Sequence, residues 1–215
     1  MNKQINKIDE FINWLEQNAP DDACIIFLAM FENPAVEQKT DERALEVKTY
    51  VDGYDADISK MLVRKMHDIP LLVQVFNEAL FQVGVKLDYD NFLKWREKNK
   101  YDNQFEPFDL ETSGSDEEVS ENAEPEEYIK KVQEFSVWMN EKPSRNMTLL
   151  LLAQDQLNSP KTTFAMGFAP DISNLVANEL KENYGLRSIL ESAMFAMEHK
   201  ASFEEFQTWK DSLKK

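Results

Sequence analysis

Two histidines are the residues of this sequence best suited to acid–base or metal chemistry. His67 and His199 lie far apart in the chain, and neither belongs to an H-x-x-x-H or H-E-x-x-H pattern, which would place two metal ligands on one helix face. Each stands near the end of a predicted helix, where a positive charge contributes about 0.3–1 kcal/mol. We therefore interpret both as surface or helix-end residues, and we expect neither a metal site nor histidine-based catalysis.

The candidate nucleophiles also lack the surroundings that catalysis requires. Cys24 is the single cysteine and lies in the apolar run CIIFLAMF, which is typical of a buried, unreactive thiol. A lone cysteine also excludes an internal disulfide and a cysteine-based zinc site. Ser59 and Ser173 each follow an aspartate by two residues, but the sequence contains no G-x-S-x-G, phosphate-loop or dinucleotide-binding pattern. We expect a protein that is not an enzyme and binds no cofactor.

The charge of the chain is strongly negative and unevenly distributed. There are 40 acidic and 24 basic residues, which gives a net charge of −16. The segment Glu106–Glu127 holds ten acids and no base. An acidic chain without a basic cluster is a poor binder of nucleic acids and of anionic membranes. With no apolar run long enough to span a membrane, and no pattern typical of a signal peptide, we expect a cytoplasmic protein whose partners are proteins.

The clearest pattern in the sequence is a repeat. Gly53–Val63 reads GYDADISKMLV, and Gly167–Ala177 reads GFAPDISNLVA. With an offset of 114 residues, Gly53–Glu97 aligns with Gly167–Asp211 without a gap, and ten of the 45 positions are identical. The identical pairs are Gly53/Gly167, Asp57/Asp171, Ile58/Ile172, Ser59/Ser173, Leu72/Leu186, Ala79/Ala193, Phe81/Phe195, Lys86/Lys200, Phe92/Phe206 and Trp95/Trp209.

Both copies predict the same order of secondary structure. Upstream of the glycines the offset becomes 124, which aligns CIIFLA with TLLLLA. Each copy begins with an amphipathic helical pattern, IDEFINWLEQN or IKKVQEFSVWMNEK. An apolar run and a second segment, LEVKTYV or TTFAMGF, then predict a β-hairpin. Two helices follow, at Asp55–His67 and Pro70–Val83 in one copy and Pro170–Asn183 and Gly185–Glu198 in the other. A final amphipathic helix (DYDNFLKWREKN or SFEEFQTWKDSLKK) ends each copy.

The repeated glycines have a structural explanation. Gly53 and Gly167 stand where the second strand ends and the chain must turn into a helix, and a residue without a Cβ adopts such a turn at low cost. Asp57 and Asp171 then fall in the first helical turn, where a carboxylate is stabilised by the helix dipole.

The sequence therefore predicts an α+β fold made by tandem duplication of an α-β-β-α-α-α unit, with each hairpin packed against helices. We expect a first repeat domain at residues 1–103, an acidic flexible linker at 104–124 and a second repeat domain at 125–215. The two hairpins either form separate sheets or join into one four-stranded antiparallel sheet, and joining would protect two open edges. The alternative is an all-α protein in which the leucine-rich runs are helices.

The repeated tryptophans lie on the short amphipathic helices. We interpret Trp14, Trp138, Trp95 and Trp209 as packing residues, with exposed anchors for a partner as the alternative.

These patterns favour a non-enzymatic protein-binding module, either a structural component or an inhibitor. The alternatives are an acidic mimic of nucleic acid and a small-ligand binder with a pocket between the two halves. The copies differ most in the hairpin loop, where NPAVEQKTDER faces NSPK, and loops diverge at little cost to a core. We expect partner binding by this loop and the acidic segment, through Pro34, Glu37, Lys39, Asp41, Arg43, Phe105, Phe108 and Leu110.

Overall fold

The computed structural model of the chain describes residues 2–32, 45–99, 127–141, 147–154, 161–199 and 203–212. It is an α+β protein with a four-stranded antiparallel sheet, so the all-α alternative is wrong. The chain forms two compact units, each made of two segments. The sheet unit comprises Met1–Gly53 and Pro107–Gly167, and the helical unit comprises Tyr54–Glu106 and Phe168–Lys215. No helix in the described ranges is long and apolar enough to cross a membrane.

The sheet unit contains two hairpins that join into one sheet. The strands are β1 (Cys24–Glu32), β2 (Leu45–Asp52), β3 (Met147–Gln154) and β4 (Lys161–Met166). Their order is β2-β1-β3-β4, and every neighbouring pair is antiparallel. Both predicted hairpins are thus confirmed, and of the two alternatives left open for them the structure has the joined sheet. The β1–β3 register places Phe27 opposite Leu151, two positions that are related by the sequence offset of 124.

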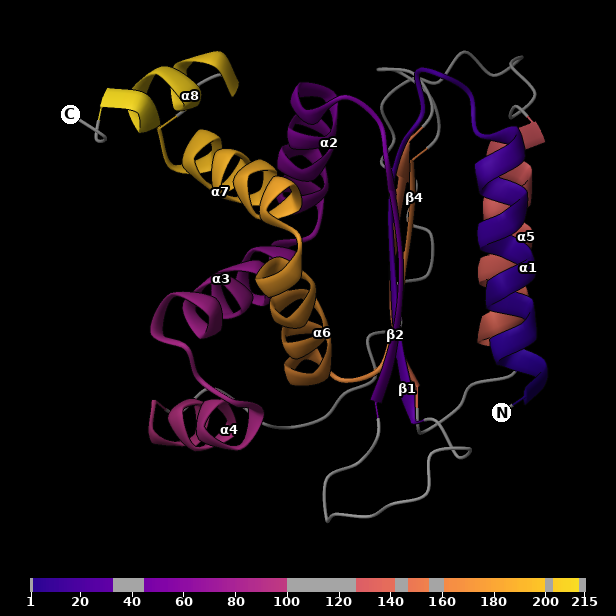
Figure 1. Cartoon of the computed structure of the whole chain (residues 1–215), viewed down its shortest axis with the longest axis horizontal. Helices are drawn as coiled ribbons and strands as arrows, with labels where there is room; N and C mark the ends of the chain where they lie inside the picture. The colour runs from indigo at the N-terminus through magenta and orange to yellow at the C-terminus, as the bar shows by residue number, and fades with distance from the viewer. Residues whose placement is uncertain are drawn as a thin grey trace. The chain divides into compact units, whose positions relative to one another are not determined.

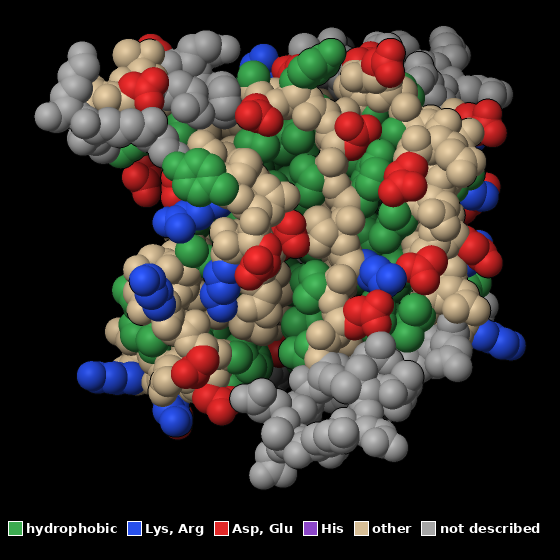
Figure 2. Space-filling model, in the orientation of Figure 1, with side chains coloured by type: hydrophobic (Ala, Val, Ile, Leu, Met, Phe, Trp, Pro, Cys, Tyr) green, Lys and Arg blue, Asp and Glu red, His purple; other side chains and the backbone are tan. Residues whose placement is uncertain are grey.

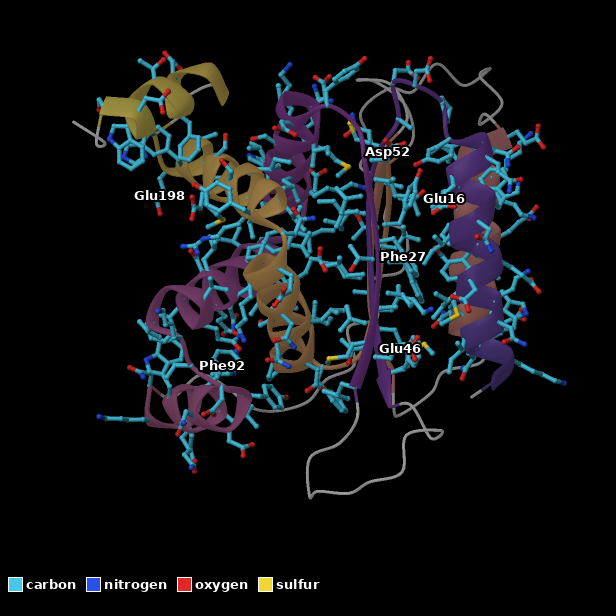
Figure 3. All side chains as sticks on the ribbon, viewed as in Figure 1. Glu16, Phe27, Glu46, Asp52, Phe92 and Glu198 are labelled. Carbon is cyan, nitrogen blue, oxygen red and sulfur yellow. The ribbon has the colours of Figure 1, made fainter. Side chains whose placement is uncertain are left out.

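Two helices cover one face of this sheet. They are α1 (Asn2–Asn18) and α5 (Glu127–Asn140), drawn side by side in Figure 1. Phe11 of α1 and Phe135 of α5 stack with ring centroids 4.0 Å apart, and Phe27 of β1 contacts both rings edge-on at 5.8 and 5.7 Å. Figure 3 shows Phe27 projecting from the sheet toward these helices. Trp14 and Trp138 pack partly buried against the same core, as the packing interpretation predicts.

The helical unit is built from six helices in the described residues. They are α2 (Asp55–Asp68), α3 (Pro70–Val85), α4 (Tyr89–Lys98), α6 (Ala169–Glu182), α7 (Tyr184–His199) and α8 (Phe203–Ser212). Proline at the start of α3 has no backbone N–H to continue α2, so the chain bends at Ile69. Within the unit α3 packs on α6 and α2 packs on α7, while α4 and α8 lie at opposite ends (Figure 1).

The two repeated glycines adopt the backbone conformation that their position predicts. Gly53 has φ 118° and Gly167 has φ 120°, in a region that side-chain-bearing residues rarely adopt. Space is also restricted, because a Cβ on Gly53 would lie 2.9 Å from the backbone oxygen of Ala23. On Gly167 it would lie 3.1 Å from the side-chain oxygen of Thr148. Both turns into α2 and α6 therefore depend on glycine.

We predict that Gly53→Ala destabilises the protein by about 2–3 kcal/mol, because strain and a backbone clash combine. Gly167→Ala should cost less, since the Thr148 side chain can move. Gly84→Ala is the control: no atom lies within 4 Å of its added Cβ, and alanine in a helix is favoured by about 1 kcal/mol. Urea denaturation measures all three free energies of unfolding. Equal effects at the three glycines would contradict the conformational argument.

Candidate functional site

The predicted partner-binding residues lie outside the part of the chain that the structure describes. They are Pro34, Glu37, Lys39, Asp41 and Arg43 in the first loop, and Phe105, Phe108 and Leu110 in the acidic segment. The predicted linker, residues 104–124, lies outside it as well. The role of these residues stays a prediction.

The two histidines and the cysteine lie in ordinary structural positions. His67 is exposed in the last turn of α2. His199 is exposed in the last turn of α7, where its ring stacks on Phe195 with centroids 4.2 Å apart. Cys24 is buried in β1, as predicted. Among the described residues, no group of three histidine, cysteine or acidic side chains could hold a metal ion.

The repeated serines connect helices of the helical unit. Ser59 of α2 and Ser192 of α7 lie with their hydroxyl oxygens 3.2 Å apart. Ser173 of α6 donates a hydrogen bond of 2.9 Å to Glu78 of α3. Positions 78 and 192 are themselves related by the offset of 114, so the same interhelical contact occurs twice with different partners. The sequence pattern around these serines did not predict this contact.

Glu78 is the centre of a buried polar network. Its side chain is 4% exposed and pairs with Arg96 of α4, which is 1% exposed. One carboxylate oxygen also accepts a 2.9 Å hydrogen bond from the Gln74 amide, and the other accepts from Ser173. Three donors therefore surround the carboxylate, as a buried charge requires. The Arg96 guanidinium also lies 5.8 Å from the ring centroid of Phe92.

A groove of about 470 Å³ lies above this network, along α3 and α4. Its lining residues are Pro70, Val73, Gln74, Asn77, Glu78, Phe81 and Trp95. The six residues from α3 recur at helical spacing and form one stripe of that helix. At one end the Phe81 and Trp95 rings stack with centroids 4.3 Å apart. The repeated Phe81 and Trp95 therefore pack on each other and also form a wall of the groove.

Four side chains hold the groove wall α4 in place. Arg96 pairs with Glu78, Trp95 stacks on Phe81, and Phe92 is fully buried, projecting from α4 toward the rest of the helical unit in Figure 3. The Tyr89 hydroxyl donates a hydrogen bond to the Asp171 carboxylate of α6. Burial raises the pKa of Tyr89 well above its usual range, and the hydrogen bond to Asp171 raises it further.

The corresponding face of α7 has a different character. The positions aligned with Val73 and Asn77 are Arg187 and Glu191, which form a salt bridge of 2.9 Å on the helix surface. Phe195 and Trp209 stack at 4.8 Å, like Phe81 and Trp95. The aromatic pair is thus common to both halves of the helical unit, whereas the α3 stripe has uncharged residues, Val73 and Asn77, where α7 has the charged pair.

Comparison with known proteins gives no family for this chain. No protein-family model matches it, and neither a curated protein nor a solved structure shows a significant similarity to it.

We predict that Tyr89→Phe lowers the free energy of unfolding at pH 7 by about 1 kcal/mol, through loss of the hydrogen bond to Asp171. Because the folded-state pKa of Tyr89 is raised, its contribution is complete below about pH 10 and is lost as the pH rises further. The difference between wild type and variant should therefore shrink above pH 10. Burial also raises the pKa of Tyr50, to about 12, so only the difference isolates Tyr89.

Urea denaturation at pH 7 to 11 measures this difference. Tyr54→Phe, which removes an exposed hydroxyl, is the matched control and should show no such trend. A difference for Tyr89→Phe that stays constant above pH 10 would contradict the assigned contact.

We predict that Arg96→Met destabilises the protein by about 3–5 kcal/mol, because it leaves the Glu78 carboxylate buried without its cation. The double variant Glu78→Gln/Arg96→Met should recover most of that loss, since a neutral amide can still bond to Gln74 and Ser173. A double-mutant cycle by urea denaturation measures the coupling. Additive effects of the two substitutions would show that the pair does not act as a unit.

Proposed function

We propose that this protein is a non-enzymatic protein-binding module, built by tandem duplication, that acts through surface complementarity as a structural component or an inhibitor. The observation that supports it best is the character of α3. Its single charged residue, Glu78, is buried, and its exposed positions are all uncharged: Pro70, Leu71, Asn77, Gly84 and Val85. The outer face of a surface helix normally carries charged residues, so an exposed face without them supports contact with a partner.

The groove residues have the composition of a protein-binding surface. The centres of such interfaces are depleted in charge and enriched in aromatic side chains. Phe81 and Trp95 provide the aromatic wall, and Pro70 and Val73 provide the aliphatic one. The fold itself does not demand an uncharged surface here, because α7 carries the Arg187–Glu191 pair at the aligned positions. We infer that contact with a partner explains why the surface of α3 is uncharged where that of α7 is charged.

The proposed duplication is supported by contacts as well as by the alignment. In the sheet, Ile25 pairs with Ala153 and Ala29 pairs with Leu149, and the offset of 124 converts one pair into the other. In the helical unit, the offset of 114 converts the Phe81–Trp95 stack into the Phe195–Trp209 stack. Two related halves would have allowed one copy of the surface to acquire a partner while the other kept its charges.

The distribution of charge favours this function over a mimic of nucleic acid for the surface described. The helical unit contains 17 acidic and 14 basic residues, whereas the sheet unit contains 23 acidic and 10 basic residues. A mimic needs an excess of acids on rigid elements, and the unit that carries the groove has little excess. Partner contacts by the Pro34–Arg43 loop and by Phe105–Leu110, and a cytoplasmic location, remain part of the proposal.

We predict that a photo-crosslinking amino acid at position 77, in the groove, gives a discrete adduct with another protein when the chain is expressed in its native cell. The aligned position 191 on α7 is the matched control and should give at least tenfold less adduct. Trp95→Ala should remove most of the adduct at position 77, because it removes one wall of the groove. Gel analysis and mass spectrometry identify the products.

Equal adducts from positions 77 and 191 would contradict the proposal, as would the absence of any protein adduct. A small molecule that copurifies with the chain and is released by Trp95→Ala would instead favour the small-ligand alternative, since a groove of about 470 Å³ falls in the usual size range of such sites.

A further inference from the structure

The charges beside the groove identify the kind of segment that it accepts, and this inference rests on the proposed protein-binding function. Helix α4 contributes Trp95 to the groove. At 3.6 residues per turn, Lys98 lies about 60° and Lys94 about 100° around the helix from Trp95, on its solvent side. The acids Asp90 and Glu97 follow at about 140–160°. Lys94 and Lys98 are therefore the exposed charges closest to Trp95 on its own two turns of α4, and the capping residue Asp88 lies about two turns away along the helix axis.

These lysines are available to a partner. Lys94 and Lys98 are both exposed and neither forms a salt bridge in the described ranges, while the charge of Lys94 also acts on Asp88 at the start of α4. In Figure 2, Lys and Arg side chains project outward at the lower left, over α4, with acidic side chains beside them. Around the helix, Lys94 and Lys98 lie closer to Trp95 than Asp90 and Glu97 do.

The floor of the groove favours a peptide over a cation. The Glu78 carboxylate already accepts from Arg96, Gln74 and Ser173, so it has no remaining charge to offer a positive ligand. The Asn77 amide is exposed and makes no hydrogen bond within the described part of the chain. An amide of this kind can donate to and accept from a peptide backbone.

We infer that the groove binds a short acidic segment of a partner protein. One aromatic or large aliphatic side chain of that segment packs against Phe81 and Trp95, its backbone bonds to Asn77, and its carboxylates pair with Lys94 and Lys98. The apolar contact supplies most of the affinity, and the charge pairs at the rim select acidic neighbours and speed association.

The probe for this inference is a fluorescein-labelled peptide, Gly-Glu-Asp-Phe-Asp-Glu-Gly, whose binding to the full chain is measured by fluorescence anisotropy. Lys94→Glu/Lys98→Glu should weaken binding at least tenfold, and raising the salt from 0.05 to 0.5 M should weaken binding to the wild type. Trp95→Ala should also weaken it about tenfold. Peptides with alanine in place of phenylalanine, or lysine in place of the acids, should bind at least tenfold more weakly.

Matched variants control for net charge and for loss of an aromatic residue. Lys3→Glu/Lys7→Glu makes the same charge change at the same spacing on α1, and Trp209→Ala removes the aligned tryptophan of α8. Both should change the dissociation constant less than twofold. Because Lys94 and Lys98 are exposed, their reversal tests the inference even if Trp95→Ala fails to fold.

Three results would overturn the inference. One is equal weakening by the α1 and α4 charge reversals, and another is equal or tighter binding of the lysine peptide. The third is binding at least tenfold tighter to Phe105→Ala/Phe108→Ala than to wild type, which would assign the groove to the chain's own acidic segment. A persisting adduct at position 77 alongside any of these results would leave the protein-binding function intact and reject only the acidic chemistry.

Discussion

The pairing of β1 with β3 is the interaction on which the rest of the fold depends. A single hairpin is marginally stable and exposes two edges, whereas the β1–β3 ladder converts two hairpins into one sheet with two central strands. The core over one face then needs residues from both hairpins and both covering helices, as the contacts among Phe11, Phe27 and Phe135 show. These strands are separated by more than 100 residues, so neither half of the chain completes this core alone.

The helical unit also needs both halves of the chain, because its main contacts join α3 to α6 and α2 to α7. Two similar helix–helix interfaces result, one with Ser59 and Ser192 and the other with Ser173 and Glu78. The Ser59–Ser192 pair shows that such an interface can form without a buried charge. A buried ion pair contributes little net stability compared with apolar or neutral packing. The Glu78–Arg96 pair is better explained by its effect on α4. Arg96 fixes this helix and thereby the position of Trp95 in the groove wall.

Local sequence patterns predicted most of the helices and strands. The features that they did not predict, the choice of a joined sheet and the groove, depend on contacts between residues far apart in the sequence. Alternating and helical periods, with glycine at the strand-to-helix turns, were sufficient for the hairpins and helices. The joined sheet remained one of two alternatives, because strand order depends on contacts across the two halves. The groove was not predicted, since Glu78, Arg96 and Ser173 meet only in the folded helical unit. Its one local signal was a lone charge in the apolar sequence of α3.

An acidic protein that receives an acidic segment needs a physical explanation, and the distribution of charge provides one. Repulsion by the net charge of −16 acts over distance and is screened beyond about 10 Å at 0.1 M salt. The excess lies mainly outside the helical unit, where acids and bases nearly balance. On the two turns of α4 around Trp95 the exposed charges closest to that side chain are Lys94 and Lys98, and the one carboxylate that lines the groove, Glu78, is already paired with Arg96. Short-range attraction therefore outweighs the remaining repulsion once the apolar side chain is in the groove.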